Sequence, residues 1–268
     1  MIYDKTKSKG AAMNYKKEEL HCIYGENDIF GKLYVPQDGG KICPAVICSH
    51  GFNSKGDDME DIAINYAEHG IIAYTFDYCG GGIRSQSSGK SVDMSIETEQ
   101  DNLRHVIDMI CGLPQADKTQ IYLYGESQGG FVAALTSAEM PKRFAGLFLI
   151  YPAFCIPDQW LSKNPDEMAE PFSFMGDMML SKKYYDGVPR YDVYKHISAF
   201  KKPVLIYHGD CDGIVDISYA KRVREAYENS SLTVIKGGGH GFSGDDKAFV
   251  RNSVCNYVIK QMNEKNSR

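Results

Sequence analysis

The chain contains 268 residues, 43% of them hydrophobic and 24% charged, and carries a formal net charge of -5 at pH 7. This size and balance are typical of one globular domain, and the lack of any run of Lys or Arg argues against a nucleic acid or an anionic membrane as a partner. The eight cysteines are scattered singly, and no apolar stretch is long enough to span a membrane, so we expect a cytoplasmic protein that acts on a small molecule.

The order of the predicted elements indicates an α/β fold. Residues 1–13 are polar and are expected to be poorly ordered, ahead of a single domain over residues 14–268. Segments 20–24 and 29–35 predict an opening antiparallel pair of strands. Strands and helices then alternate, which predicts a mostly parallel, twisted sheet flanked by helices on both faces. The expected strands lie at 45–48, 71–77, 121–125, 147–151, 204–207 and 232–235, and the expected helices at 59–69, 95–109, 217–228 and 247–262, with another that starts near residue 127.

The alternation is interrupted between about residues 153 and 198. This segment is rich in proline and aromatic residues and contains the only tryptophan of the chain. An insertion at this point of an α/β sheet lies above the carboxyl ends of the strands, where ligands bind. The sequence therefore predicts a lid subdomain, with an aromatic-rich insert that has no role in substrate binding as the alternative.

The segment Gly125-Glu-Ser127-Gln-Gly129 lies between a β-type run and a helical pattern. This setting is typical of a nucleophile elbow, in which a serine occupies a tight turn from strand to helix and glycines leave room for that turn. The first N–H groups of the following helix, beginning with Gln128, are then directed at an oxygen that becomes negative beside Ser127. A turn serine without a chemical role is the alternative.

A serine hydroxyl needs an imidazole to accept its proton and a carboxylate to orient that imidazole. Asp212 and His240 each follow a predicted strand, in the chain order of serine, acid and histidine. All three groups are therefore expected on one rim of the sheet. Asp210 competes with Asp212, and we prefer Asp212 because it precedes the apolar pair Ile214-Val215 by two residues.

A second donor to the oxyanion is expected in the loop after the strand at 45–48. His50-Gly51-Phe52 occupies this loop, and the N–H of Phe52 is the predicted donor, paired with that of Gln128. A simple turn at the end of the strand is the alternative for this motif.

With these motifs in order, the chain resembles the α/β-hydrolase superfamily over residues 16–264. Within it, the chain is similar to the bacterial cinnamoyl and feruloyl esterases. The features that carry this likeness are His-Gly-Phe at residues 50–52, Gly-Glu-Ser-Gln-Gly-Gly at 125–130, and an insert that begins with Pro152-Ala153 and ends before Lys202-Pro203.

The resemblance implies an esterase that cleaves esters of ferulate, caffeate or p-coumarate with sugars or quinate. In such enzymes the insert holds the phenolic ring, and a polar residue near its start contacts the ring hydroxyl. The matching position is Asp158, or Gln159 if the insert aligns without a gap. Tyr184 and Tyr185 are further candidates to line the same pocket through aromatic contacts. The acidic and methionine content of this insert departs from the family, which leaves the preferred acyl group open.

The sequence therefore predicts a serine carboxylic-ester hydrolase that works through an acyl-enzyme, with no metal and no cofactor. We expect a small-molecule ester as its partner, neither nucleic acid nor membrane, and leave a homodimer open. The alternatives are a peptidase or thioesterase that uses the same triad, and a catalytically silent hydrolase fold that binds a small ligand.

Overall fold

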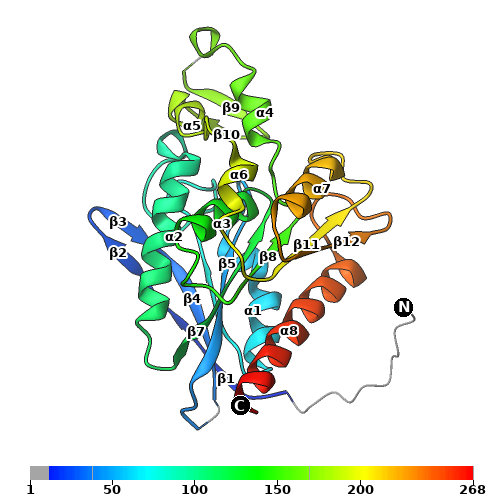
Figure 1. Ribbon diagram of the computed structural model, residues 1–268. Helices are drawn as coiled ribbons and strands as arrows, with labels where there is room; N and C mark the ends of the chain where they lie inside the picture. Colours follow the sequence, from blue (N-terminus) through cyan, green and yellow to red (C-terminus); the bar gives the residue numbers. More distant parts are fainter. Residues whose placement is uncertain (1–11, 38, 169, 268) are drawn as a thin grey trace.

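The computed structural model describes residues 12–37, 39–168 and 170–267. Its centre is an eight-stranded sheet with the strand order β1-β4-β6-β5-β7-β8-β11-β12 (Figure 1). The first two pairs, β1/β4 and β4/β6, are antiparallel, and the other neighbours are parallel, which confirms the predicted α/β fold. The strands are β1 (Tyr15–Glu19), β4 (Gly31–Pro36), β5 (Cys43–Ser49), β6 (Ile72–Phe76), β7 (Ala116–Glu126), β8 (Gly146–Ile150), β11 (Val204–Gly209) and β12 (Ser230–Ile235).

Helices cover both faces of the sheet. Helices α1 (Glu60–Ala67) and α8 (Gly244–Asn266) pack on one face. The other face is covered by α2 (Ile96–Cys111), α3 (Ser127–Glu139), α6 (Val193–Ile197) and α7 (Ile217–Ala226). No helix in the described part of the chain is both long and apolar enough to cross a membrane.

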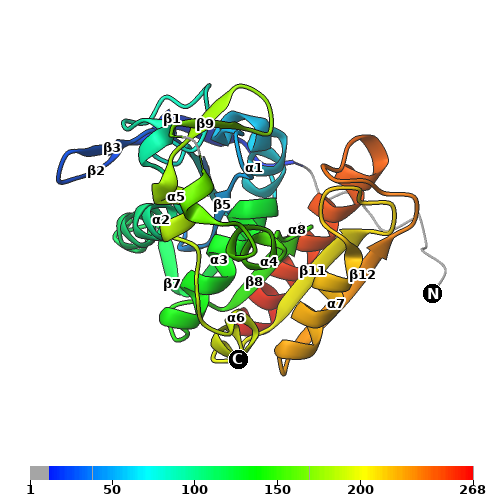
Figure 2. The same cartoon turned by 90° about the horizontal axis from the view of Figure 1, so that it is seen from above.

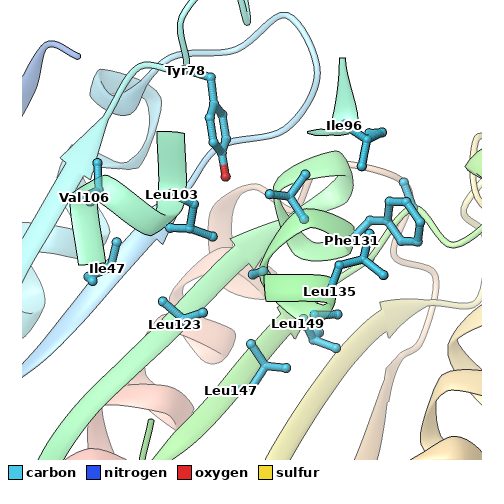
Figure 3. Packing of buried hydrophobic residues seen from close by; sticks show 14 of the residues in the cluster. Ile47, Tyr78, Ile96, Leu103, Val106, Leu123, Phe131, Leu135, Leu147 and Leu149 are labelled. Carbon is cyan, nitrogen blue, oxygen red and sulfur yellow. The ribbon is translucent and has the colours of Figure 1, made fainter. Parts of the chain in front are cut away.

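The central strands are buried on both sides, so their sequences are almost continuously apolar. In β5, Ala45 and Ile47 belong to the core under α2 and α3, whereas Val46 and Cys48 belong to the core under α1 and α8. Successive side chains of a strand point to opposite faces, so one short apolar run supplies both cores. Figure 3 shows the first core, where strand residues such as Ile47 and Leu123 meet side chains of α2 and α3.

The opening strands differ from the prediction. The expected pair is present only as a short separate hairpin of β2 (Cys22–Tyr24) and β3 (Asn27–Ile29), while β4 pairs with β1 in the main sheet. The sequence pattern does not predict β1, because this polar edge strand has one neighbour and a largely solvent-exposed face. Of the segment expected to be poorly ordered, residues 1–11 lie outside the described residues, and Met13 donates its N–H to the carbonyl of Glu68 (2.9 Å).

The insert lies beyond the carboxyl ends of the central strands (Figures 1 and 2). Two hydrogen bonds join the insert to the 3₁₀ turn η2 (Ser91–Asp93). The hydroxyl of Ser91 in η2 donates to the carbonyl of Met179 in the insert, and the hydroxyl of Ser181 in the insert donates to the carbonyl of Val92, each at 2.6 Å. Its elements are α4 (Ile156–Leu161), η3 (Pro165–Glu167), β9 (Phe172–Phe174), β10 (Met178–Leu180), α5 (Lys182–Asp186) and α6.

Candidate active site

Ser127 occupies a strained turn between β7 and α3. Its φ is +51°, a left-handed conformation that is unfavourable for residues with a side chain. The turn closes only with glycine on both sides: a Cβ at Gly125 would lie 2.4 Å from the carbonyl oxygen of Gly129, and a Cβ at Gly129 would lie 2.3 Å from that of His50. This tight turn exposes the Ser127 hydroxyl beyond the end of the sheet, as in a nucleophile elbow.

The structure brings Ser127, His240 and Asp212 together. Nε2 of His240 lies 2.9 Å from Oγ of Ser127, and Nδ1 of His240 lies 2.8 Å from Oδ2 of Asp212. An Nδ1–H that donates to the carboxylate leaves the lone pair of Nε2 free to accept the hydroxyl proton of Ser127. The arrangement is that of a base next to a nucleophile, with the base held by an acid.

Of the two candidate acids, only Asp212 contacts the imidazole. Its side chain is fully buried, and its other oxygen, Oδ1, accepts the backbone N–H groups of Ile214 and Val215 at 2.9 Å each. Asp210 is exposed and instead accepts the N–H of Gly237 (2.6 Å). Asp210 therefore ties together the two loops that carry Asp212 and His240.

A second histidine, His208, lies behind the acid, and its role was not predicted from the sequence. It is fully buried, donates Nε2–H to the carbonyl of Val215 (2.8 Å), and has Nε2 3.2 Å from Oδ2 of Asp212. Burial lowers the pKa of His208, so the ring is neutral at pH 7. The pattern His208-Gly-x-x-Asp212 was the available signal, because His208 lies near the end of β11, the strand that leads into the loop of Asp212.

The loop after β5 lies against the nucleophile. A Cβ at Gly51 would lie 3.1 Å from Cβ of Ser127. The buried side chain of His50 holds this loop in place. Its Nδ1–H donates to the carbonyl of Gly51 (2.7 Å), and its Nε2 accepts the N–H of Tyr78 (3.0 Å). Burial lowers the pKa of His50, which keeps the neutral tautomer that both contacts require.

Two main-chain donors next to Ser127 are free. Within the described residues, neither the N–H of Phe52 nor that of Gln128 donates a hydrogen bond to another protein group, and both residues line the pocket beside Ser127. Buried N–H groups without an acceptor are rare. Here they are available to an oxygen that develops negative charge next to the serine.

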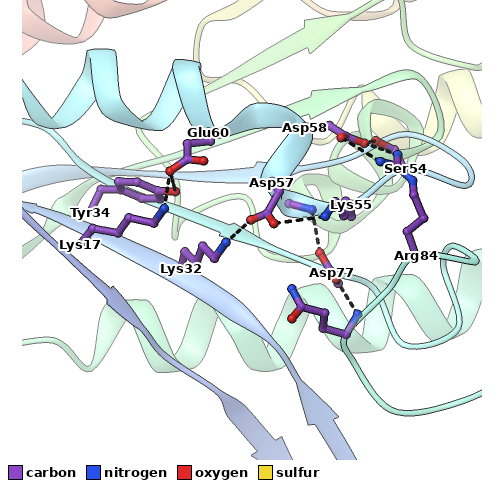
Figure 4. A network of polar contacts seen from close by, with 12 residues as sticks. Lys17, Lys32, Tyr34, Ser54, Lys55, Asp57, Asp58, Glu60, Asp77 and Arg84 are labelled. Carbon is purple, nitrogen blue, oxygen red and sulfur yellow. Dashed lines mark hydrogen bonds and ion pairs between the residues drawn. The ribbon is translucent and has the colours of Figure 1, made fainter.

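A polar network fixes the far end of the same loop (Figure 4). Asp77 is buried and accepts the N–H of Gly56 (2.7 Å) and that of Gln86 (2.8 Å), one with each carboxylate oxygen. Arg84 pairs with Asp58 at 2.6 Å. These contacts join the loops that follow β5 and β6 and so restrict the segment that contains Phe52.

A pocket of about 260 Å³ opens next to Ser127. Its aromatic wall consists of Phe52 and three residues of the insert, Trp160, Phe174 and Tyr184. The ring of Trp160 lies 4.6 Å from that of Tyr184 and 5.0 Å from that of Phe174, between centroids. The wall is therefore a packed aromatic cluster with a flat, largely apolar surface.

Only half of the predicted insert residues line this pocket. Gln159 and Tyr184 do. Asp158 does not: it is exposed and accepts the hydroxyl of Tyr219 (3.0 Å). Tyr185 also lies outside, with its ring 5.1 Å from the guanidinium of Arg190. Neighbouring residues of a helix point about 100° apart, so one member of each pair faces the pocket and the other faces away.

Several residues of the site were missed from the sequence. Trp160 and Phe174 form the pocket wall, and the only tryptophan of the chain, directly after Gln159, was the available signal. Tyr151, with φ +37°, packs its ring 4.8 Å from that of His240. Glu126 also lines the pocket; it accepts the hydroxyl of Tyr124 (2.9 Å), and burial raises its pKa. Across residues 12–37, 39–168 and 170–267, no cluster of His, Cys, Asp and Glu side chains is arranged to hold a metal ion.

Comparison with known families and proteins identifies a family and several relatives. The family model described as serine aminopeptidase, S33, matches residues 40–185. Human monoglyceride lipase is 33% identical over 112 residues, which are 40% of this chain and 34% of the lipase. The monoglyceride lipase homolog of monkeypox virus is 25% identical over 134 residues, which are 49% of this chain and 46% of that protein. The matches thus span about a third to a half of these relatives' own length.

Solved structures share the whole fold. Est1E from Butyrivibrio proteoclasticus, solved with ferulic acid, matches with a TM-score of 0.81 and 23% identity over 93% of this chain and 100% of that one. Acetyl xylan esterase 1 from Thermoanaerobacterium sp. JW/SL YS485 matches with a TM-score of 0.65 and 19% identity over 92% and 88% of the two chains. At these identities the likeness establishes a common α/β-hydrolase architecture.

Proposed function

This chain belongs to the serine aminopeptidase S33 family, and we propose from that premise that it is a serine esterase that cleaves hydroxycinnamoyl esters through an acyl-enzyme. Ser127, Asp212 and His240 are the proposed triad. The single observation that carries the proposal is the hydrogen-bonded chain from Asp212 through His240 to Ser127, next to an aromatic pocket.

In the first step, Oγ of Ser127 attacks the ester carbonyl while Nε2 of His240 takes the hydroxyl proton. The oxyanion accepts the N–H groups of Phe52 and Gln128, and removing one such donor typically costs about 100-fold to 1,000-fold in rate. Asp212 stabilises the imidazolium and keeps Nδ1 protonated. His240 then gives its proton to the departing alcohol, and the carbonyl re-forms as the acyl-enzyme.

In the second step, a water molecule loses a proton to Nε2 of His240 and attacks the acyl carbon. The same two N–H groups bind the second oxyanion. Collapse of this intermediate breaks the bond to Ser127, whose oxygen regains the proton from His240, and the free acid leaves.

The pocket wall supports an aromatic acyl group. A hydroxycinnamoyl group is flat and conjugated, and it can stack on the rings of Trp160, Phe174 and Tyr184. Gln159 lines the same pocket and carries an amide that can bond a phenolic hydroxyl. The structural neighbour solved with ferulic acid supports the same assignment.

Glu126 favours a second candidate, an aminopeptidase. It is the one carboxyl side chain among the described residues that line the pocket, and a carboxylate is the group that would bind the ammonium of a peptide N-terminus. Against this role, the hydroxyl of Tyr124 already binds Glu126, and burial raises the pKa of Glu126, which disfavours its ionised form.

One experiment separates these functions. Purified protein is first treated with a fluorophosphonate probe, with Ser127→Ala as the control. Rates are then compared for methyl ferulate, p-nitrophenyl acetate, an acyl-CoA and an aminoacyl p-nitroanilide. We expect labelling at Ser127 and the highest kcat/KM for methyl ferulate. A preference for the anilide that disappears in Glu126→Gln would favour the peptidase, a preference for acyl-CoA the thioesterase, and no labelling the silent binding module.

A further inference from the structure

Three buried polar side chains form a continuous chain from the core to the insert. Nε2–H of Gln128 donates to Oε2 of Glu99 (2.9 Å), and the hydroxyl of Tyr184 donates to Oε1 of Gln128 (2.6 Å). Their exposed fractions are 1% for Glu99, 2% for Gln128 and 1% for Tyr184. Because they come from α2, α3 and α5, respectively, they connect the insert to the helix that begins at the nucleophile.

We propose that Glu99 and Tyr184 are positioning residues that hold Gln128 where its backbone N–H can bind the oxyanion. This inference rests on the proposed function, because an oxyanion forms only if Ser127 attacks an acyl group. Gln128 lies in the first turn of α3, where the N–H groups have no acceptor within the helix. Its side chain is held at both ends of the amide, so the adjacent backbone has little freedom to turn away.

Stabilisation of an oxyanion depends on donors that are already oriented before the reaction. A donor on an unrestrained first turn would have to be ordered during the reaction, at a cost to kcat. The bridge from Glu99 to Tyr184 supplies that restraint from two elements outside α3. Loss of either contact is therefore expected to lower kcat more than it raises KM.

The bridge also couples the pocket to the oxyanion donor. The ring of Tyr184 is part of the pocket wall, 4.6 Å from the ring of Trp160 between centroids, while its hydroxyl holds Gln128. An acyl group that packs on this wall contacts the same side chain that restrains the donor. Tyr184 thus links recognition of the acyl group to stabilisation of the transition state.

The charge of Glu99 sets the pH range in which the bridge works. Burial raises the pKa of Glu99 to about 8, although the hydrogen bond from Gln128 opposes this shift. The groups that face Glu99 are the phenols of Tyr78 and Tyr184, whose pKa values burial raises well above 10, and the amide of Gln128. Glu99 is therefore neutral at pH 7. Above pH 8 it becomes a buried anion next to Gln128, and that charge opposes the oxyanion.

The test is a pH profile of p-nitrophenyl acetate hydrolysis between pH 6 and 10. This substrate does not depend on a preference for hydroxycinnamoyl groups. The variants are Tyr184→Phe, Glu99→Gln and Glu99→Leu, with Tyr185→Phe as the matched control because Tyr185 lies outside the pocket. Thermal melts at pH 7 verify that each variant is folded, and Glu99→Gln preserves the shape and neutrality of the native side chain.

We expect Tyr184→Phe and Glu99→Leu to lower kcat about tenfold with KM within about twofold of the wild type, and Tyr185→Phe to leave both unchanged. If only the neutral form of Glu99 supports the reaction, the wild type should lose activity about fivefold between pH 8 and 9. Glu99→Gln, which keeps the acceptor for Gln128, should retain the rate at pH 7 within about twofold and keep that rate at pH 9.

The outcomes separate this inference from the proposed function. A wild-type protein that neither reacts with a fluorophosphonate probe nor hydrolyses the ester overturns the proposed function. An active wild type overturns the inference alone if Tyr184→Phe equals Tyr185→Phe in kcat, or if Glu99→Gln shows the same loss of activity above pH 8 as the wild type.

Discussion

The buried imidazole of His208 lies 3.2 Å from the same oxygen of Asp212 that binds His240. Its Nε2–H donates to the carbonyl of Val215, whose own N–H in turn binds Asp212. His208 therefore braces the turn that holds the acid, and it does so without touching Ser127 or the pocket.

This contact predicts that His208→Leu lowers both stability and kcat, although His208 does not line the pocket. The carbonyl of Val215 loses its buried donor, which costs about 1–3 kcal/mol of stability, and the looser turn is expected to lower kcat about tenfold with little change in KM. His208→Gln, which keeps a side-chain N–H, should restore most of the loss. Steady-state kinetics and denaturant unfolding measure both effects, and equal kcat values for the two variants would contradict the bracing role.

The two candidate acids provide a matched pair of substitutions. Asp212→Asn replaces the acceptor of Nδ1–H and favours the wrong tautomer of His240, so kcat should fall by about 10,000-fold. Asp210→Asn removes the same charge from the neighbouring loop, where the side chain accepts the N–H of Gly237. We expect less than about a tenfold effect there. Comparable losses in the two variants would refute the assignment of Asp212.

The pocket wall predicts a selective defect. Phe174→Leu removes a ring that lines the pocket and packs on Phe52 (5.3 Å between centroids). It should raise KM for methyl ferulate about tenfold, equivalent to about 1.4 kcal/mol, and leave p-nitrophenyl acetate hydrolysis unchanged. Phe172→Leu is the control, since Phe172 lies on the same strand but does not line the pocket. If both variants lose ferulate binding equally, the wall does not recognise the acyl group.

Glu99 predicts how stability depends on pH. Its pKa is raised in the folded protein to about 8 from an ordinary value of 4.5, so the folded state binds more protons than the unfolded state between these pH values. The contribution of Glu99 is fully present below pH 4.5 and is lost as pH rises to about 8, by at most about 5 kcal/mol. Unfolding free energies of Glu99→Gln and the wild type should therefore diverge as pH rises from 5 to 8, with the variant the more stable. A constant difference across that range would show that Glu99 does not titrate as described.

Much of the candidate site follows from local sequence patterns. The glycines on both sides of Ser127 are dictated by contacts within one turn and with the neighbouring strand end. Asp212 and His240 could be placed on the same rim because each follows a strand with a clear apolar pattern. The first strand, β1, could not be predicted, since an edge strand with a polar face carries no such pattern.

Local patterns do not decide which way a side chain points on a short helix. Asp158 and Gln159 are polar neighbours on α4, yet only Gln159 lines the pocket. Tyr184 and Tyr185 are chemically identical neighbours on α5, yet only Tyr184 lines it. Packing of α4 and α5 against the body of the protein makes that choice. The sequence pattern named both members of each pair and could not choose between them by their place on the helix.

The sequence by itself determined the parallel part of the sheet, the elbow and the three loops that carry the triad, because periodicity and turn sterics act over a few residues. Only the tertiary structure decided that Glu99, Gln128 and Tyr184 meet, since 29 residues separate the first pair and 56 the second. Contacts over such separations arise when whole helices and the insert pack together, and no short pattern records them. The same packing selected the pocket wall and the bracing role of His208.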